Sequence, residues 1–60
     1  MTTRFAKIRR GGSFWFRGQE WRRIRGRWAL PVRLIGEGYA GFYFDITTLV
    51  EVKGEDHEQD

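Results

Sequence analysis

Apolar and polar residues alternate with a period of two along most of this chain, and glycines interrupt the alternation at short intervals. Such alternation is typical of β-strands that bury one face, and the segments between the glycines are rich in aromatic and β-branched residues. The predicted strands are Arg4–Arg9, Ser13–Arg17, Glu20–Arg25, Trp28–Ile35, Tyr39–Phe44 and Leu49–Lys53. Asp45–Thr48 is predicted to be a turn, because Asp and Thr side chains bond to the nearby backbone.

The number of strands limits the fold class. Five or six short antiparallel strands in 60 residues cannot bury a core in a flat sheet with two bare edges, so we predict an all-β fold, a small closed or nearly closed barrel. Ten residues are Phe, Trp or Tyr, which is enough for one small core in a chain that has no cysteine. The barrel is predicted to span residues 1–53, and residues 54–60 are predicted to be a disordered acidic tail.

The first predicted hairpin decides which aromatic side chains are buried. A two-residue turn at Gly18–Gln19 pairs Phe16 with Trp21 and Trp15 with Arg22. Because directly paired residues share a face of the sheet, Phe16 and Trp21 are predicted to point into the core and Trp15 to point outward.

The second predicted hairpin turns at Gly36–Gly38. Its predicted core face comprises Trp28, Leu30, Val32, Leu34, Ala40, Phe42 and Phe44. A β-bulge near Arg22–Arg23 in the first hairpin is also predicted, because it returns Ile24 to the core. These patterns predict structural roles for Trp21 and Trp28.

Trp15 has two interpretations. With Arg22 across from it and Arg17 two residues along, an exposed Trp15 is a stacking platform for a base or an anchor for a protein partner. Alternatively, an arginine covers the ring through a cation–π contact, and the role of Trp15 is structural.

Charge is divided unevenly along the chain. Residues 1–36 carry ten basic side chains and one acidic one, whereas residues 37–60 carry one basic and seven acidic. Arginine outnumbers lysine by nine to two, and arginine both forks onto phosphate and stacks on planar rings. The predicted function is therefore nucleic-acid binding, and the alternatives are an inhibitor or adaptor that binds another protein and a surface that is only solvated by arginine. The predicted binding residues are Arg9, Arg10, Trp15, Arg17, Arg22, Arg23, Arg25, Arg27, Arg33, Tyr39 and Tyr43.

Little in the sequence supports catalysis, so we predict that the protein is not an enzyme. The only histidine, His57, lies in the acidic tail, and the only serine, Ser13, has no nucleophile motif around it. Asp45 is interpreted as a turn former and Glu51 as an outward strand residue. Gly36–Gly38 is interpreted as a turn and not as a phosphate loop, because no helix with Lys-Ser/Thr follows it. No metal site and no cofactor are predicted.

The stretches FAKIRRGGSFWFRGQEWRRI and FDITTLVEV carry a recurring pattern of apolar residues, glycines and aromatics. Its positions are held by Ile8, Gly12, Phe14, Phe16, Gly18, Trp21 and Ile24, and then by Phe44, Thr48, Val50, Glu51 and Val52. In these residues the chain resembles the very short β-barrel accessory proteins of tailed bacteriophages and prophages. The resemblance implies an SH3-like topology and an accessory phage protein that acts by binding.

The cellular context is expected to be the cytoplasm, that of the bacterial host if the chain is phage-derived. The chain has no cysteine, no apolar run long enough to span a membrane and no apolar signal core, so no membrane partner is expected. The expected partners are DNA, RNA or a host protein. A chain this small can also complete its barrel or its site as a homodimer.

The acidic tail provides a first test. If Glu55–Asp60 screens the basic face, deleting it will tighten nucleic-acid binding, because a competing negative charge is removed. Fluorescence anisotropy of a labelled oligonucleotide, titrated with the chain with and without these residues, measures the change. Unchanged affinity would reject the screening interpretation.

Overall fold

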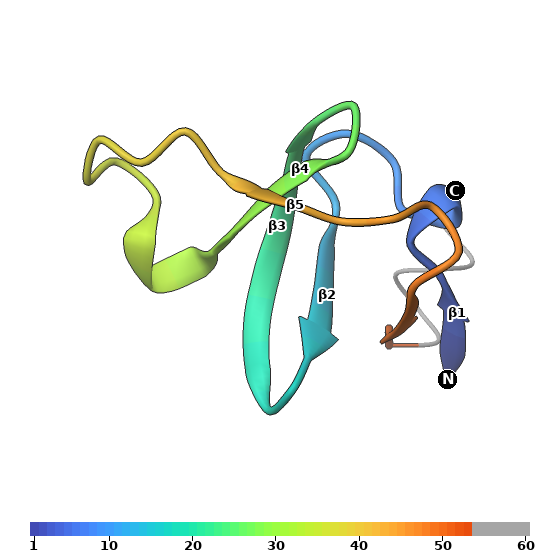
Figure 1. The fold of residues 1–60 in the computed structure, drawn as a ribbon. Coiled ribbons are helices and arrows are strands. Elements are labelled where there is room, and N and C mark those ends of the chain that lie inside the picture. Colours follow the sequence, from blue (N-terminus) through green and yellow to red (C-terminus); the bar gives the residue numbers. More distant parts are fainter. Residues whose placement is uncertain (54–60) are drawn as a thin grey trace.

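Six short strands form one open antiparallel sheet in the computed structural model, which describes residues 1–53 (Figure 1). The strands are β1 Thr2–Arg4, β2 Ser13–Phe16, β3 Gln19–Arg25, β4 Trp28–Pro31, β5 Phe42–Tyr43 and β6 Leu49–Glu51. Their order across the sheet is β1-β6-β2-β3-β4-β5, so β1 and β5 are its edges. The 3₁₀ turns η1 (Phe5–Lys7) and η2 (Val32–Leu34) follow β1 and β4.

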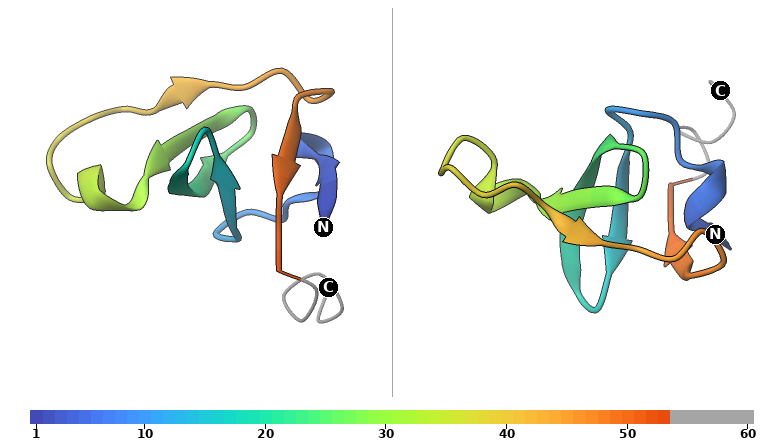
Figure 2. Two further views of the ribbon diagram at one scale, coloured as in Figure 1. Left: turned by 90° about the horizontal axis from the view of Figure 1, so that it is seen from below. Right: turned by 45° about the horizontal axis from the view of Figure 1, so that its top comes forward.

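The all-β prediction is confirmed. The segment between β5 and β6 lies outside the plane of the sheet. This segment runs across one side of the sheet and returns the chain to β6, next to β1 (Figure 2). The acidic tail that was predicted for residues 54–60 lies outside the described residues.

The first predicted strand, Arg4–Arg9, is wrong beyond its first residue, because the chain turns into η1. A 3₁₀ turn aligns residues three apart, and the buried side chains Phe5 and Ile8 are three apart. A continuous strand would point these two side chains to opposite faces. The backbone N–H of Phe5 donates to the Thr48 carbonyl at 2.7 Å, which docks η1 against the chain before β6.

The β2–β3 hairpin turns at Arg17–Gly18 and not at the predicted Gly18–Gln19. Both turn residues have positive φ, 53° and 79°, as a type I′ turn requires. The partner of Trp21 is therefore Phe14 and not Phe16. The register differs from the predicted one by two residues, which leaves every side chain on its predicted face, and Phe14 and Trp21 are buried.

A bulge in β3 lies opposite β4 between Arg23 and Arg25, slightly later than predicted. Ile24 is only partly buried and does not join the core cluster, so its predicted return to the core is wrong. The bulge instead brings Arg25 into register with Trp28.

The β4–β5 pairing differs from the predicted register by an odd number of residues, which exchanges the two faces. Trp28 pairs with Tyr43 and Ala29 pairs with Phe42. Ala29 is fully buried, whereas Trp28 is 41% exposed, so the prediction of a core role for Trp28 is wrong. Ala29 belongs to the same core cluster as the large aromatic side chains, so the inner face of β4 is the face that Ala29 occupies.

The rest of the predicted second hairpin is confirmed only in part. Phe44 joins the core cluster as predicted, whereas Leu30 is buried but lies outside that cluster, and β4 ends at Pro31, just before η2 begins at Val32. Of the other residues on the predicted core face, those that are only half-buried are Val32 and Leu34, and those that are exposed are Ala40 and Phe42. The predicted strand Tyr39–Phe44 is reduced to the two residues of β5.

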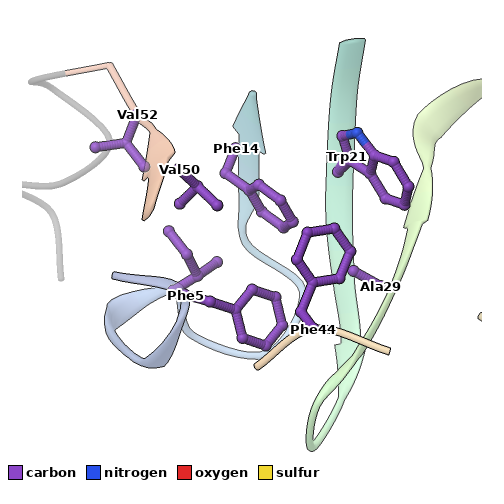
Figure 3. Packing of buried hydrophobic residues seen from close by; sticks show 8 residues of the cluster. Phe5, Phe14, Trp21, Ala29, Phe44, Val50 and Val52 are labelled. Atoms are coloured by element: carbon purple, nitrogen blue, oxygen red, sulfur yellow. The ribbon is translucent and has the colours of Figure 1, made fainter. Parts of the chain in front are cut away.

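An aromatic cluster forms the core beneath the sheet (Figure 3). The Phe44 ring stacks on Phe5 with 5.0 Å between ring centres and meets Phe14, Phe16 and Trp21 edge-on at 5.5, 5.3 and 5.0 Å. Edge-to-face and offset stacked pairs stabilise a core beyond the area that they bury. The Trp21 indole N–H donates to the Phe16 carbonyl at 3.2 Å, so its polar atom is satisfied.

Substitutions of two phenylalanines test this account of the core. Phe14 is fully buried, and Phe14→Ala is expected to cost about 3–5 kcal/mol, which is close to the total stability that a core of this size provides. Phe42, which is 48% exposed, serves as the control. Circular dichroism and urea denaturation should find the Phe14→Ala chain largely unfolded and the Phe42→Ala chain folded, and the reverse order would contradict the packing.

Candidate nucleic-acid interface

Trp15 lies between two carboxylates on the outer face of the sheet, opposite the aromatic core. Its cross-strand partners are Glu20 of β3 and Glu51 of β6, and the Lys53 ammonium lies 5.2 Å from the centre of its ring. The predicted partner Arg22 is wrong, because the turn begins one residue earlier than expected. Glu51 is paired with the Met1 amino group, so the charges around Trp15 balance and offer a phosphate chain no excess of positive charge. The cation over the Trp15 ring is a lysine and not the expected arginine.

Trp28 occupies the basic half of the same face, next to the edge strand β5. Its cross-strand partners are Arg25 of β3 and Tyr43 of β5. The Trp28 side chain is 41% exposed and Tyr43 is 55% exposed, and their rings meet at 75° with 5.6 Å between centres. The exposed tryptophan with an arginine beside it, which was predicted at Trp15, is therefore found at Trp28.

Arg27, in the turn between β3 and β4, forms hydrogen bonds with Tyr43 of the edge strand β5 and with Phe44, which follows it. Its Nη1 donates to the Tyr43 hydroxyl at 3.1 Å, and its carbonyl oxygen accepts from the Phe44 N–H at 2.7 Å. The hydrogen bond to Tyr43, with a smaller effect from Asp45, raises the pKa of Arg27 above its ordinary value. The hydrogen bond also anchors the Tyr43 ring by its hydroxyl group.

Arg22 and Arg25 complete the basic half of the outer face. Both side chains are exposed, and within residues 1–53 neither guanidinium has a hydrogen bond, ion pair or ring contact. Unpaired guanidinium donors are available to an anion and can bind phosphate in a bidentate manner. The surface formed by Arg22, Arg25, Arg27, Trp28 and Tyr43 is called the Trp28 surface below.

The loop before β2 brings Arg9 and Arg10 to the end of the sheet at which the β3–β4 turn lies. The backbone N–H of Gly11 in this loop donates to the Arg23 carbonyl at 2.8 Å. The loop and the β3–β4 turn are seen together at the top of Figure 1. Arg9 and Arg10 therefore add positive charge beside the Trp28 surface.

Arg23 was predicted to bind a partner, but its guanidinium is used within the fold. Its Nε donates to the Gly26 carbonyl at 2.8 Å, and its Nη1 donates to the Ile8 carbonyl. Its Cζ atom lies 4.7 Å from the centre of the Phe5 ring, in cation–π geometry. These contacts fix the loop before β2 to the core and leave Arg23 poorly placed for a phosphate.

Three other predicted binding residues lie apart from the Trp28 surface. Arg17 is in the β2–β3 turn, with its Cζ 5.3 Å from the centre of the Phe16 ring, and Arg33 of η2 donates from Nε to Gln19 Oε1 at 3.1 Å. Tyr39, which is 57% exposed, is in the loop that projects from the sheet between η2 and β5 (Figure 1). A shallow depression near the β2–β3 turn is lined by Gln19, Glu20, Val32 and Arg33.

Two of the four carboxylates in the described part of the chain, those of Asp45 and Glu51, have hydrogen-bond partners. Asp45 Oδ1 accepts hydrogen bonds from the Thr47 N–H at 2.9 Å and the Thr47 hydroxyl at 2.7 Å, which confirms the predicted turn and lowers the pKa of Asp45. Glu51 accepts from the Thr2 hydroxyl and the amino group of Met1, which lower its pKa. Within residues 1–53, no three acidic or histidine side chains gather into a possible metal site.

Trp28 is the member of the site that sequence reasoning missed. Its alternation with Leu30 assigned it to the core face of a long regular strand. The signal that could have identified it is its position directly after the tight turn at Gly26–Arg27, with Arg25 just before that turn. A residue at a hairpin turn has few neighbours to bury it, and flanking arginines are typical of a solvent-facing site.

Comparisons with known protein families, with curated proteins and with solved structures found no match. Within the described residues, no helix has the length and apolar character needed to cross a membrane.

The lowered pKa of Asp45 makes a prediction about pH. A carboxylate with a lowered folded-state pKa contributes stability above its unfolded pKa and loses that contribution as the pH falls through the folded value. Asp45→Asn keeps the acceptor oxygen but does not titrate. The melting temperature of the parent chain should therefore exceed that of Asp45→Asn at pH 6, and the difference should shrink below about pH 4. A difference that is constant from pH 6 to pH 2 would contradict this role.

Proposed function

We propose that this protein is a non-catalytic nucleic-acid-binding module and that the Trp28 surface contacts the nucleic acid. One observation carries the proposal: two exposed aromatic rings and the unpaired guanidiniums of Arg22 and Arg25 share one half of one sheet face. Arginine contributes charge-assisted hydrogen bonds to phosphate, and exposed aromatic rings stack on bases.

The charge distribution supports the same function. Residues 1–53 carry eleven basic side chains and four acidic ones. Two of these acids, Glu20 and Glu51, flank Trp15 in the other half of the outer face. The Trp28 surface therefore lies on the side of the molecule that attracts a polyanion, and such attraction supplies most of the non-specific affinity for nucleic acid.

We further propose that the sheet is a small SH3-like barrel and that the protein is a phage accessory protein of the host cytoplasm. The sequence resemblance implies both. Six short antiparallel strands around an aromatic core, with the chain after β5 crossing one side of the sheet, fit such a barrel. Its function depends on the Trp28 surface, since the barrel alone specifies no activity.

A protein partner is the second candidate, and strand β5 favours it. β5 is an edge strand whose two residues, Phe42 and Tyr43, are 48% and 55% exposed. Hydrogen-bonded and non-hydrogen-bonded pairs alternate along antiparallel strands. Because the Phe44 N–H bonds to the Arg27 carbonyl, the peptide groups of Tyr43 point away from β4 and are open to another strand. An inhibitor or adaptor for a host protein would use this edge.

Two double variants with the same loss of charge test the nucleic-acid proposal. Arg22→Gln with Arg25→Gln removes two guanidiniums from the Trp28 surface, and Arg17→Gln with Arg33→Gln removes two from outside it. Each pair lowers the net charge by the same amount, so only the position of the charge differs. The first pair is expected to weaken binding and to reduce the slope of log affinity against log salt by about 1–2.

The measurement is fluorescence anisotropy of labelled single-stranded and duplex oligonucleotides between about 50 and 200 mM salt. The Arg17 and Arg33 pair should bind nearly as the parent chain does. Equal losses from both pairs would mean that binding follows net charge and not the Trp28 surface. No binding of any oligonucleotide at low salt would overturn the nucleic-acid proposal and favour a protein partner.

A further inference from the structure

The two rings of the Trp28 surface pack edge-on against each other, with 5.6 Å between their centres. Gly41, just before β5, has a φ of 125°, and a Cβ atom there would lie 3.2 Å from the Trp28 Cβ. The missing side chain lets the backbone pass close to Trp28. Tyr43 is anchored by the hydrogen bond from Arg27. Rings that are already ordered lose little conformational entropy on binding, so the surface is preorganised for a planar ligand.

Planar bases are available in single strands and not in duplexes. A base in a duplex is stacked on both neighbours, and its flat face reaches a protein ring only after it has been flipped out. A base in a single strand is free to stack, and every base has such a face. A fixed exposed ring with arginines beside it therefore fits a single strand.

We propose that the Trp28 surface selects single-stranded nucleic acid, with a base stacked on the exposed face of Trp28 and the adjacent phosphates bound by Arg22 and Arg25. This inference rests on the proposed nucleic-acid function and adds the strand form to it. The Tyr43 ring stands at 75° to the Trp28 ring, so a base that is parallel to Trp28 meets Tyr43 edge-on. A single base cannot stack on both rings, and Trp28 therefore provides one stacking position.

Trp15 is a matched control that the fold itself provides. It belongs to the same outer face, but Glu20 and Glu51 are its cross-strand partners and Lys53 lies over its ring. Glu20 and Glu51 offset the positive charges of Lys53 and the Met1 amino group, so this half of the face attracts a phosphate chain less strongly, and the lysine competes with a base for the ring. The single strand is therefore confined to the half of the face that carries Trp28.

The test compares three 12-nucleotide probes, which are labelled dT12, labelled U12 and a labelled 12-base-pair duplex, at about 50 mM salt. The parent chain is expected to bind dT12 or U12 at least tenfold more tightly than the duplex, and the comparison of dT12 with U12 distinguishes DNA from RNA. Trp28→Ala should weaken single-strand binding by about 5- to 150-fold, as expected for the loss of one stacked base.

Tryptophan fluorescence distinguishes direct stacking on Trp28 from a structural role of Trp28, because only stacking quenches the emission of that ring. Binding of dT12 or U12 should quench the fluorescence of the parent chain and of Trp15→Phe, whereas the quenching should be lost in Trp28→Phe. Trp28→Phe keeps a flat ring and should retain part of the affinity, which separates lost stacking from lost folding. Far-UV circular dichroism of each variant verifies that the sheet is intact.

The outcomes separate this inference from the function on which it rests. Duplex binding as tight as single-strand binding, unaffected by Trp28→Ala, would overturn single-strand selection and leave the nucleic-acid function standing. Single-strand binding that Trp28→Ala does not weaken would overturn the stacking position. The failure of all three probes to bind would overturn the function and the inference together.

Discussion

The packing of Phe44 is the constraint on which the rest of the structure depends. Its ring contacts aromatic rings from η1, β2 and β3, which are those of Phe5, Phe14, Phe16 and Trp21. One residue therefore joins segments that are far apart in the sequence. Its backbone N–H also bonds to the carbonyl of Arg27, the residue whose guanidinium holds Tyr43. The aromatic core and the Trp28 surface are thus built around the same residue, and the site is only as well ordered as the core beneath it.

Arginine side chains in this small domain either stabilise the fold or face solvent, depending on which face of the sheet they occupy. Arg23 donates to two backbone carbonyls and its guanidinium lies over the Phe5 ring, so its role is structural. Arg22, its neighbour in the sequence, points to the opposite face and has no partner within the described residues. Successive residues of a strand point to opposite faces, so a pair of adjacent arginines is divided between structure and solvent.

A wrong strand register matters only when it is wrong by an odd number of residues, because an odd shift exchanges the two faces of the sheet and an even shift preserves them. The β2–β3 turn differs from the predicted one, yet Phe14 and Trp21 are buried as expected, because the error of two residues preserves the faces. The β4–β5 error is odd, and it moved Trp28 from the predicted core to the outer face. Glu20 beside Trp15 could not be foreseen for a related reason, since a different turn selects a different cross-strand partner. Local alternation located β2 and β3 closely, overestimated the length of β4 and β5, and identified strand partners poorly.

The sequence by itself determined an all-β chain with an aromatic core, a turn at Asp45 and an excess of arginine in its first half. These properties depend on residue type and on spacing along the chain, which are local quantities. Only the tertiary structure decided which tryptophan is exposed beside arginine and which lies between carboxylates. That choice depends on strand register, which is set by the Arg17–Gly18 turn and by the packing of Ala29 in the core cluster. The packing around Ala29 joins segments that are distant in the sequence, and alternation along the chain does not specify it.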